Sequence, residues 1–205
     1  MTAQVIRADQ KEALDLAVRL IQNGDVIAFP TDTVYGIAAG AFNPEGILRL
    51  YEIKGRERLK AIPILIGSLE QLPLVTASVS GTARRLTSAF WPGALTLILP
   101  KNSRLPAEIS PYPTVGVRMP DHPVALAILK RTGPLAVTSA NLSGQKEATN
   151  ADEVLAQLGD SLAAIIDGGA TPGGTPSTVV EVSRDELKIL RPGPLSLDQL
   201  QHALW

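Results

Sequence analysis

Apolar residues recur along the chain at two spacings, which predict helices and short buried strands in turn. Leu14, Val18 and Ile21 lie at helical spacing, with Asp9 as a candidate N-cap and Gly24 as a stop. Short apolar runs bounded by proline, glycine or polar residues predict strands. Further helices are expected over residues 43–53, 82–90, 122–131, 151–158 and 197–204, and strands at VIAFP (ending near residue 29), IPILI (62–66), LTLIL (95–99), TVGVRM (114–119), LAVTS (135–139), AAIID (163–167), STVVEV (177–182) and LKIL (187–190).

This alternation of strands with helices of about ten residues is typical of an α/β sheet with helices packed on its faces. A short gap holding Ser183, Arg184 and Asp185 separates the last two strands and indicates a hairpin, so we expect a mixed sheet. The 16 prolines and 17 glycines are spread through the connections without forming a linker. The sequence therefore predicts a single α/β domain over residues 1–205, built on a twisted, open, mixed sheet with flanking helices.

Composition narrows the possible chemistry. The chain is 45% hydrophobic and 19% charged with a net charge of −1, which is typical of a globular protein, and no apolar run approaches the ~18 residues of a membrane span. The N-terminal stretch lacks the apolar segment of a secretory signal, so we expect a cytoplasmic protein without membrane partners. The absence of cysteine excludes thiolate nucleophiles and cysteine-ligated zinc. His122 and His202 lie far apart in the sequence, which disfavours a histidine metal site or a Ser–His dyad.

Polar clusters follow three of the predicted strands. Ligands of open α/β sheets bind outside the carboxyl ends of the strands. Each cluster alone is also typical of turns and caps, but their recurrence at strand ends favours a binding site. The clusters are Thr31, Asp32, Thr33 and Tyr35 after VIAFP, Arg118 after TVGV, and Thr138, Ser139, Asn141 and Ser143 after LAV.

Four cations stand at alternate positions in the segment YEIKGRERLK, residues 51–60: Lys54, Arg56, Arg58 and Lys60. The preceding helix is expected to end near residue 53, so we expect extended or loop geometry, in which the alternate side chains can form a row. Such a row suits a polyphosphate or a nucleic-acid backbone, and it equally suits a solvated sheet edge. The Gly/Pro-rich segment 168–176 is expected to be a surface or lid loop.

Seven motifs in order resemble the YrdC-like threonylcarbamoyl-AMP synthases over residues 10–200. The motifs are FPTDTVYG, the K-G-R of residues 54–56, FWPGALTLIL, VGVRMPDHP, TSANLSG, PSTVVEV and LRPGP. The resemblance implies a twisted α/β sheet curving round a large, basic, concave cavity. It also implies an enzyme that joins L-threonine, bicarbonate and ATP into threonylcarbamoyl-AMP and pyrophosphate, with Mg²⁺ held mainly by the ATP phosphates. The product then serves the modification of adenosine 37 of tRNA, which the protein meets directly or through partner transferase proteins.

The resemblance also implies roles for individual residues. The KxR pair of the family falls on Lys54 and Arg56 and its SxN pair on Ser139 and Asn141, which are the expected catalytic residues. The implied ATP contacts are Lys54, Arg56, Arg58, Thr114, Ser139, Asn141 and Arg191. The implied threonine contacts are Thr31, Ser177 and Arg118, whose guanidinium takes the carboxylate. The chain departs from the family pattern at Glu57, where many members have proline, and at Leu65, where many have histidine.

Two other functions remain open at this point. The first is a module that binds double-stranded RNA or tRNA without catalysis, which a net charge of −1 and the presence of the SxN pair disfavour. The second is an enzyme that forms carbamoyl-adenylate from carbamoyl phosphate for hydrogenase maturation. That activity usually belongs to a longer chain with zinc-finger and acylphosphatase segments, which do not occur in this sequence.

Overall fold

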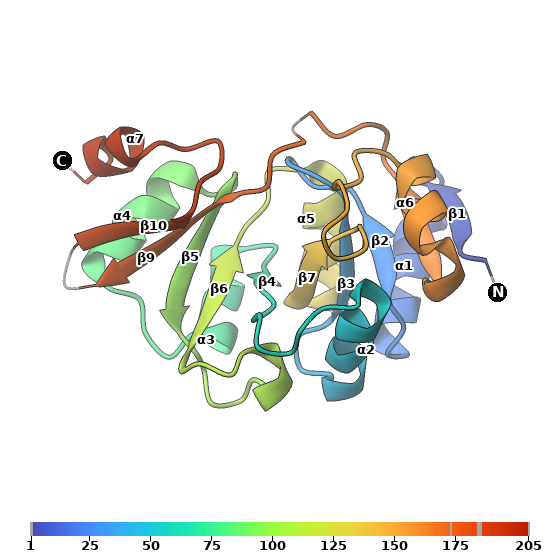
Figure 1. Ribbon diagram of the computed structural model, residues 1–205, viewed down its shortest axis with the longest axis horizontal. Coiled ribbons are helices and arrows are strands. Elements are labelled where there is room, and N and C mark those ends of the chain that lie inside the picture. The colour runs from blue at the N-terminus through green and yellow to red at the C-terminus, as the bar shows by residue number, and fades with distance from the viewer. Residues whose placement is uncertain (1, 173, 184–185, 205) are drawn as a thin grey trace.

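A computed structural model of the chain describes residues 2–172, 174–183 and 186–204. Its strands are β1 (Gln4–Arg7), β2 (Ile27–Phe29), β3 (Gly36–Gly40), β4 (Ile64–Leu65), β5 (Leu95–Pro100), β6 (Thr114–Arg118), β7 (Leu135–Ser139), β8 (Ala164–Asp167), β9 (Thr178–Ser183) and β10 (Glu186–Arg191). They form one ten-stranded sheet in the order β1-β8-β2-β3-β7-β4-β6-β5-β9-β10 (Figure 1). Its helices are α1 (Ala13–Gln22), α2 (Pro44–Lys54), α3 (Leu72–Val75), α4 (Gly81–Phe90), α5 (Pro123–Thr132), α6 (Ala151–Leu158) and α7 (Leu197–His202).

The sheet is mixed, as predicted. The pairs β1/β8, β2/β8, β4/β6 and β5/β9 are parallel, whereas β2/β3, β3/β7, β4/β7, β5/β6 and β9/β10 are antiparallel. The predicted antiparallel pairing of the last two strands is therefore confirmed as β9/β10, and Arg184 and Asp185 of the predicted gap lie outside the described residues.

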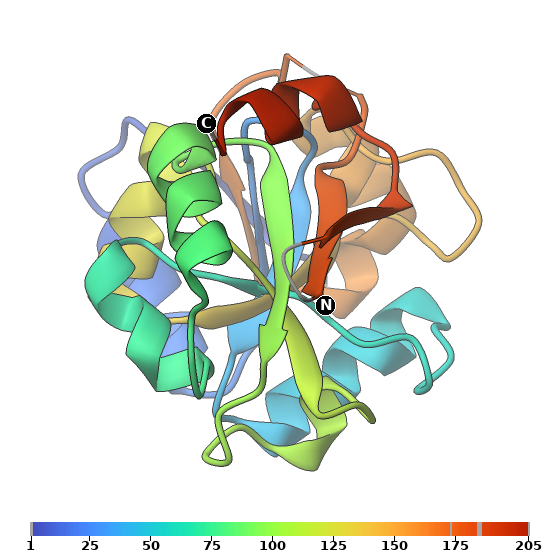
Figure 2. The same cartoon turned by 90° about the vertical axis from the view of Figure 1, so that its left-hand side faces the viewer.

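Helices cover both faces of one half of the sheet. In β2, Ile27 and Phe29 belong to the apolar cluster that contains residues of α1 and α5, and Ala28 belongs to the cluster that contains residues of α2 and α6. This alternation explains why the strand reads as a continuous apolar run. Figure 2 shows α1 and α5 on one side of the twisted sheet and α2 and α6 on the other. In the described part of the chain, no helix has both the length and the apolar character needed to cross a membrane.

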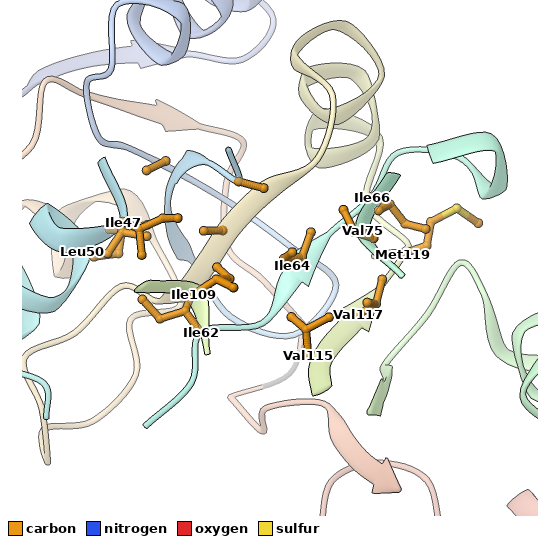
Figure 3. Close-up of a cluster of buried hydrophobic side chains, with 14 of the residues drawn as sticks. Ile47, Leu50, Ile62, Ile64, Ile66, Val75, Ile109, Val115, Val117 and Met119 are labelled. Carbon is orange, nitrogen blue, oxygen red and sulfur yellow. The ribbon is translucent and has the colours of Figure 1, made fainter. Parts of the chain in front are cut away.

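The centre of the molecule is an apolar cluster around β4. Ile64 has no exposed surface and sits among side chains of β6, α2 and the segments that flank β4 (Figure 3). The same picture labels Ile47 and Leu50 of α2, Val115 and Val117 of β6, and Ile62, Ile66, Val75, Ile109 and Met119. This cluster joins the two halves of the sheet into one core.

Several elements differ from the sequence prediction. Strands β1 and β3 and the short helix α3 were not predicted. Helix α1 begins after Glu12 and has no side-chain cap, so the assignment of Asp9 as its N-cap is wrong. Asp9 instead accepts from Arg7, with 2.7 Å between Arg7 Nη2 and its carboxylate. The central strand β4 is shorter than expected, with Ile64 and Leu65 as its two residues, and Pro63 before it has no N–H to continue the ladder.

The segment after α2 is a loop, one of the two geometries expected, but the four cations do not form a row. Lys54 is still part of α2, and the helix ends at Gly55 in the left-handed region with φ of 58°. A turn then follows, in which the Lys60 N–H donates to Glu57 O at 3.0 Å. Arg58 and Lys60 are exposed, whereas Lys54 is buried and Arg56 is half-buried. The four side chains do not line one face because the C-cap Gly55 changes the direction of the chain between Lys54 and Arg56.

Gly67 provides a test of how closely α5 packs against the segment after β4. A Cβ atom at Gly67 would lie 2.6 Å from Lys130 N and 2.8 Å from Leu129 C, which are backbone atoms of α5. We expect Gly67→Ala to lower the free energy of unfolding by about 1–3 kcal/mol, because the two backbones must separate. Gly81→Ala is the control, since a Cβ there meets nothing within 4 Å. Urea unfolding that gives Gly67→Ala the stability of wild type would contradict this packing.

Candidate active site

A cavity of about 130 Å³ opens where the carboxyl ends of β2, β6 and β7 meet the residues around β9 and β10. The three polar clusters predicted at strand ends meet here. The lining residues are Thr31, Thr33, Val34, Tyr35, Gly36, Arg56, Pro63, Leu65, Thr96, Arg118, Val137, Thr138, Ser139, Glu147, Pro176, Ser177 and Arg191. The wall thus combines three guanidinium groups with several hydroxyls. This volume is below the roughly 300–1,000 Å³ of typical ligand sites, so this cavity is smaller than the large one that the family resemblance implies.

Arg118, the last residue of β6, connects the site to two loops. Its Nε donates to Gly93 O at 2.9 Å, its Nη1 donates to Thr33 Oγ1 at 3.0 Å, and its Nη2 donates to Asp32. The residue is 5% exposed, and this burial lowers the pKa of the guanidinium while the Asp32 carboxylate opposes the shift. A guanidinium has five N–H donors, so some remain for a carboxylate in the cavity.

Arg191, at the end of β10, lies against the segment that leads into β9. Its Nη2 donates to Ser177 O at 2.8 Å and to Ser177 Oγ at 3.2 Å, and Ser177 Oγ lies 2.8 Å from Thr96 Oγ1. Burial lowers the pKa of Arg191, Glu147 raises it and Arg56 lowers it further. Arg191, the implied ATP contact, and Ser177, the implied threonine contact, are therefore joined by hydrogen bonds in the cavity wall.

Arg56 reaches the cavity from the loop after α2. Its Nε donates to Lys60 O and its Nη2 to Ala61 O, both at 3.1 Å. Burial lowers the pKa of this guanidinium, and Tyr51 opposes the shift. Since Nη1 makes none of these contacts, that end of the side chain is the part available to a ligand.

Lys54 and Asn141 lie behind the wall and do not line the cavity. The Lys54 ammonium donates to Ser139 and Asn141, with distances of 2.6 Å to Ser139 O and 2.7 Å to Asn141 O. Lys54 is 3% exposed, and burial, followed by the charge of Arg56, lowers its pKa to about 8 while Glu147 raises it. The KxR and SxN residues thus meet, and Arg56 and Ser139 are the two that face the cavity.

The remaining predicted residues fall in different places. Thr31 lines the cavity, and its Oγ1 donates to Val34 O at 2.7 Å. Arg58 is exposed and Thr114 pairs with Pro100, and neither lines the cavity, so their proposed ATP contacts remain predictions. Of the two departures from the family pattern, Leu65 lies in the cavity wall, whereas Glu57 faces outward with its carboxylate 3.5 Å from Lys60 Nζ.

Sequence reasoning missed Glu147 and Thr96. Glu147 lies in the loop between β7 and α6 and is the carboxylate among the lining residues. Nothing in its local pattern marks it, because the loop acquires its position through distant contacts such as Thr171 N–H to Thr149 O at 2.8 Å. Within the described ranges, no three His, Asp or Glu side chains gather as a metal site.

Comparisons with known proteins identify relatives over most of the chain. The Sua5_yciO_yrdC family model, described as "Telomere recombination", matches residues 19–193. The threonylcarbamoyl-AMP synthase of Bacillus subtilis is 41% identical over 188 residues, which are 90% of this chain and 54% of that protein. The threonylcarbamoyl-AMP synthase of Vibrio cholerae is 36% identical over 186 residues, or 89% of this chain and 98% of that protein.

A solved structure agrees in fold. The crystal structure of P. abyssi Sua5 complexed with L-threonine matches with a TM-score of 0.93 at 36% identity, over 99% of this chain and 61% of that one. The chain thus spans about half the length of the Bacillus relative and about three fifths of the Sua5 chain.

The charge of Glu147 yields a prediction about anion binding. Removing one negative charge from a wall with three guanidinium groups should strengthen the binding of an anion. We expect Glu147→Gln to bind pyrophosphate about 2–5-fold more tightly at low ionic strength, measured by calorimetry without added metal. Glu45→Gln is the control, because it removes the same charge from an exposed residue in the first turn of α2 that does not line the cavity. Equal affinities of Glu147→Gln and wild type would show that this carboxylate does not act on the cavity.

Proposed function

Because the chain belongs to the Sua5/YciO/YrdC family, we propose that it is a threonylcarbamoyl-AMP synthase using L-threonine, bicarbonate and ATP. One observation carries the proposal: Arg56, Arg118 and Arg191 line a single cavity together with threonine and serine hydroxyls. The carboxylate of threonine and the triphosphate of ATP both suit this combination of guanidinium and hydroxyl donors. The modification of tRNA adenosine 37, partner transferase proteins and a cytoplasmic location belong to the same proposal.

The geometry suggests how the substrates divide the site. The hydroxyls of Thr31 and Thr33 lie next to Arg118. The apolar side chains of Val34 and Leu65 line the same cavity. This surface suits the carboxylate, hydroxyl and methyl of threonine. Arg56 and Ser139 lie on another part of the wall, where they suit phosphate oxygens. We therefore propose that threonine lies beside Arg118 and the nucleotide beside Arg56 and Ser139.

The proposed chemistry relies on positioning and charge. The threonine amine attacks the carbon of bicarbonate, water leaves, and a carbamate forms. A carbamate oxygen then attacks the α-phosphorus of ATP in line with the departing pyrophosphate, so one P–O bond forms as another breaks. Arg56 and Arg191 offset the charge that develops on the phosphate oxygens. No step requires a strong protein base, which agrees with a site built from guanidinium and hydroxyl groups.

Magnesium fits this site as a partner of the nucleotide. The lining residues supply one carboxylate, Glu147, among three guanidinium groups, and this is a poor donor set for a metal held by protein alone. We therefore propose that the ATP phosphates hold Mg²⁺. When bound, the ion supplies charge neutralisation on the phosphate oxygens.

A turnover assay tests the proposed activity directly. The purified protein is incubated with ATP, Mg²⁺ and labelled bicarbonate, with and without threonine. We expect pyrophosphate release that depends on threonine, with the label entering an adenylate. Release that depends instead on carbamoyl phosphate would favour the carbamoyl-adenylate alternative. Binding of tRNA without any pyrophosphate release from active, folded protein would favour the non-catalytic alternative.

Arg56 and Arg58 form a matched pair for mutation. Arg56 faces the cavity and Arg58 is exposed two residues later. We expect Arg56→Ala to lower kcat/KM for ATP by about 10²–10³-fold, because a preorganised donor to the phosphate is lost. Arg58→Ala should lower it by less, because Arg58 does not line the cavity, and the size of its effect tests the predicted ATP contact of Arg58. Thermal unfolding is measured for both. A large fall in the Tm of Arg56→Ala with normal turnover of the folded fraction would assign Arg56 a structural role at the loop.

A further inference from the structure

The ammonium group of Lys54 has used its donors inside the protein. Nζ lies 2.6 Å from Ser139 O, 2.7 Å from Asn141 O, 3.1 Å from Asn141 Oδ1 and 3.3 Å from Ser139 Oγ. An ammonium has three N–H groups, and here four oxygens share them. A phosphate oxygen would therefore have to displace a contact that already exists.

The main chain of Lys54 also contacts the turn that follows β7, residues 139–143. The Ser143 N–H donates to Lys54 O at 3.0 Å. Lys54, the last residue of α2, thus forms hydrogen bonds to residues 139–143 through both its side chain and its backbone carbonyl. This pattern indicates a residue that fixes a turn.

Asn141 has also used its hydrogen-bonding groups within this turn. Its Nδ2 donates to Leu142 O at 2.9 Å and to Gln145 O at 2.7 Å, while its Oδ1 accepts from Lys54. Asn141 is 5% exposed. Both amide hydrogens and the amide oxygen are occupied, so Asn141 has no free donor for a ligand.

Ser139 is the member of this group that reaches the cavity. Its Oγ accepts from Lys54, so its own hydrogen is left to donate to a ligand. Ser139 also pairs with Gly36 across β7 and β3, which fixes its backbone, and its side chain lines the cavity with Arg56. An ammonium contact makes a hydroxyl a stronger donor, because it stabilises the electron density left on the oxygen.

We propose that Lys54 is a positioning residue that acts on the reaction through Ser139, and that the Ser139 hydroxyl donates to a phosphate oxygen of the nucleotide beside Arg56. Asn141 completes the turn that carries Ser139. Only Arg56 and Ser139 of the four KxR and SxN residues then contact substrate. This inference rests on the proposed function for the identity of the nucleotide, and its structural core is the set of contacts between Lys54 and residues 139–143.

A double-mutant cycle separates this role from direct phosphate binding. The variants are Lys54→Met, Ser139→Ala and the double variant, measured by threonine-dependent pyrophosphate release. We expect each single variant to lose about 10²-fold in kcat/KM, the loss typical of one preorganised donor. Because both act through one hydroxyl, Lys54→Met should cost at least tenfold less in the Ser139→Ala background than in wild type. Losses that multiply in the double variant would overturn the proposal and assign Lys54 its own phosphate contact.

Two further measurements distinguish the positioning role of Lys54 from a general loss of folded protein. Lys101→Met is the matched control, since Lys101 Nζ donates to Ser110 O at 2.7 Å away from the cavity, and it should keep wild-type kcat. Loss of folded protein alone lowers the apparent kcat at unchanged KM, so kcat is referred to the concentration of folded sites counted by pyrophosphate titration. For Lys54→Met we expect this corrected kcat to fall more than KM for ATP rises. The reverse split, a large rise in KM at unchanged kcat, would contradict the inference.

The cycle is repeated on pyrophosphate binding by calorimetry, which requires no turnover. If wild type shows no threonine-dependent release, the proposed function fails, and the coupling between Lys54 and Ser139 in pyrophosphate affinity still decides the inference. If wild type turns over and both cycles are additive, the inference fails and the function stands.

Discussion

The pairing of β4 with both of its neighbours is the constraint on which the sheet and the site depend. Ile64 and Leu65 pair with β6 on one side and β7 on the other. The Val137 N–H donates to Pro63 O at 2.9 Å, but Pro63 has no N–H with which to continue the ladder. The end of β7 therefore extends beyond its partner. Thr138 and Ser139 pair with β3 but have no partner on the β4 side, and with Pro63 and Leu65 they form a wall of the cavity.

The charges of the cavity follow from the same geometry. Arg118 ends β6, and Arg56 and Arg191 come from segments far apart in the sequence, so the fold brings three guanidinium groups into one partly buried space. Burial lowers the pKa of each, which shows that the protein environment disfavours their charged forms. An anion in the cavity would relieve this unfavourable burial and the mutual repulsion. The site is thus prepared for negatively charged ligands before any of them binds.

Patterns in the sequence predicted the elements whose signals are local. Asn43 and Pro44 begin α2 as expected, with Gly46 N–H donating to Asn43 Oδ1, and the convergence of polar residues at strand ends was also foreseeable. Strand β3 was not, because four of the five residues of Gly36–Gly40 are glycine or alanine, which have low strand propensity. Tertiary packing requires a small residue here, because a Cβ atom at Gly36 would lie 2.7 Å from Val137 Cγ1. Glu147 escaped notice for a related reason, since only the folded loop brings it to the cavity.

The same close packing determines where Lys54 stands. A Cβ atom at Gly46 would lie 3.0 Å from Ala39 Cβ, so α2 can approach β3 only because one partner is glycine and the other alanine. That approach fixes the axis of an 11-residue helix whose last residue is Lys54. A cation in the last turn is favoured by the helix dipole, and the left-handed Gly55 ends the helix at that residue. The packing of Gly46, near the start of α2, against Ala39 of β3 therefore contributes to the position of the Lys54 ammonium. Through the ammonium it also contributes to the position of the turn that carries Ser139.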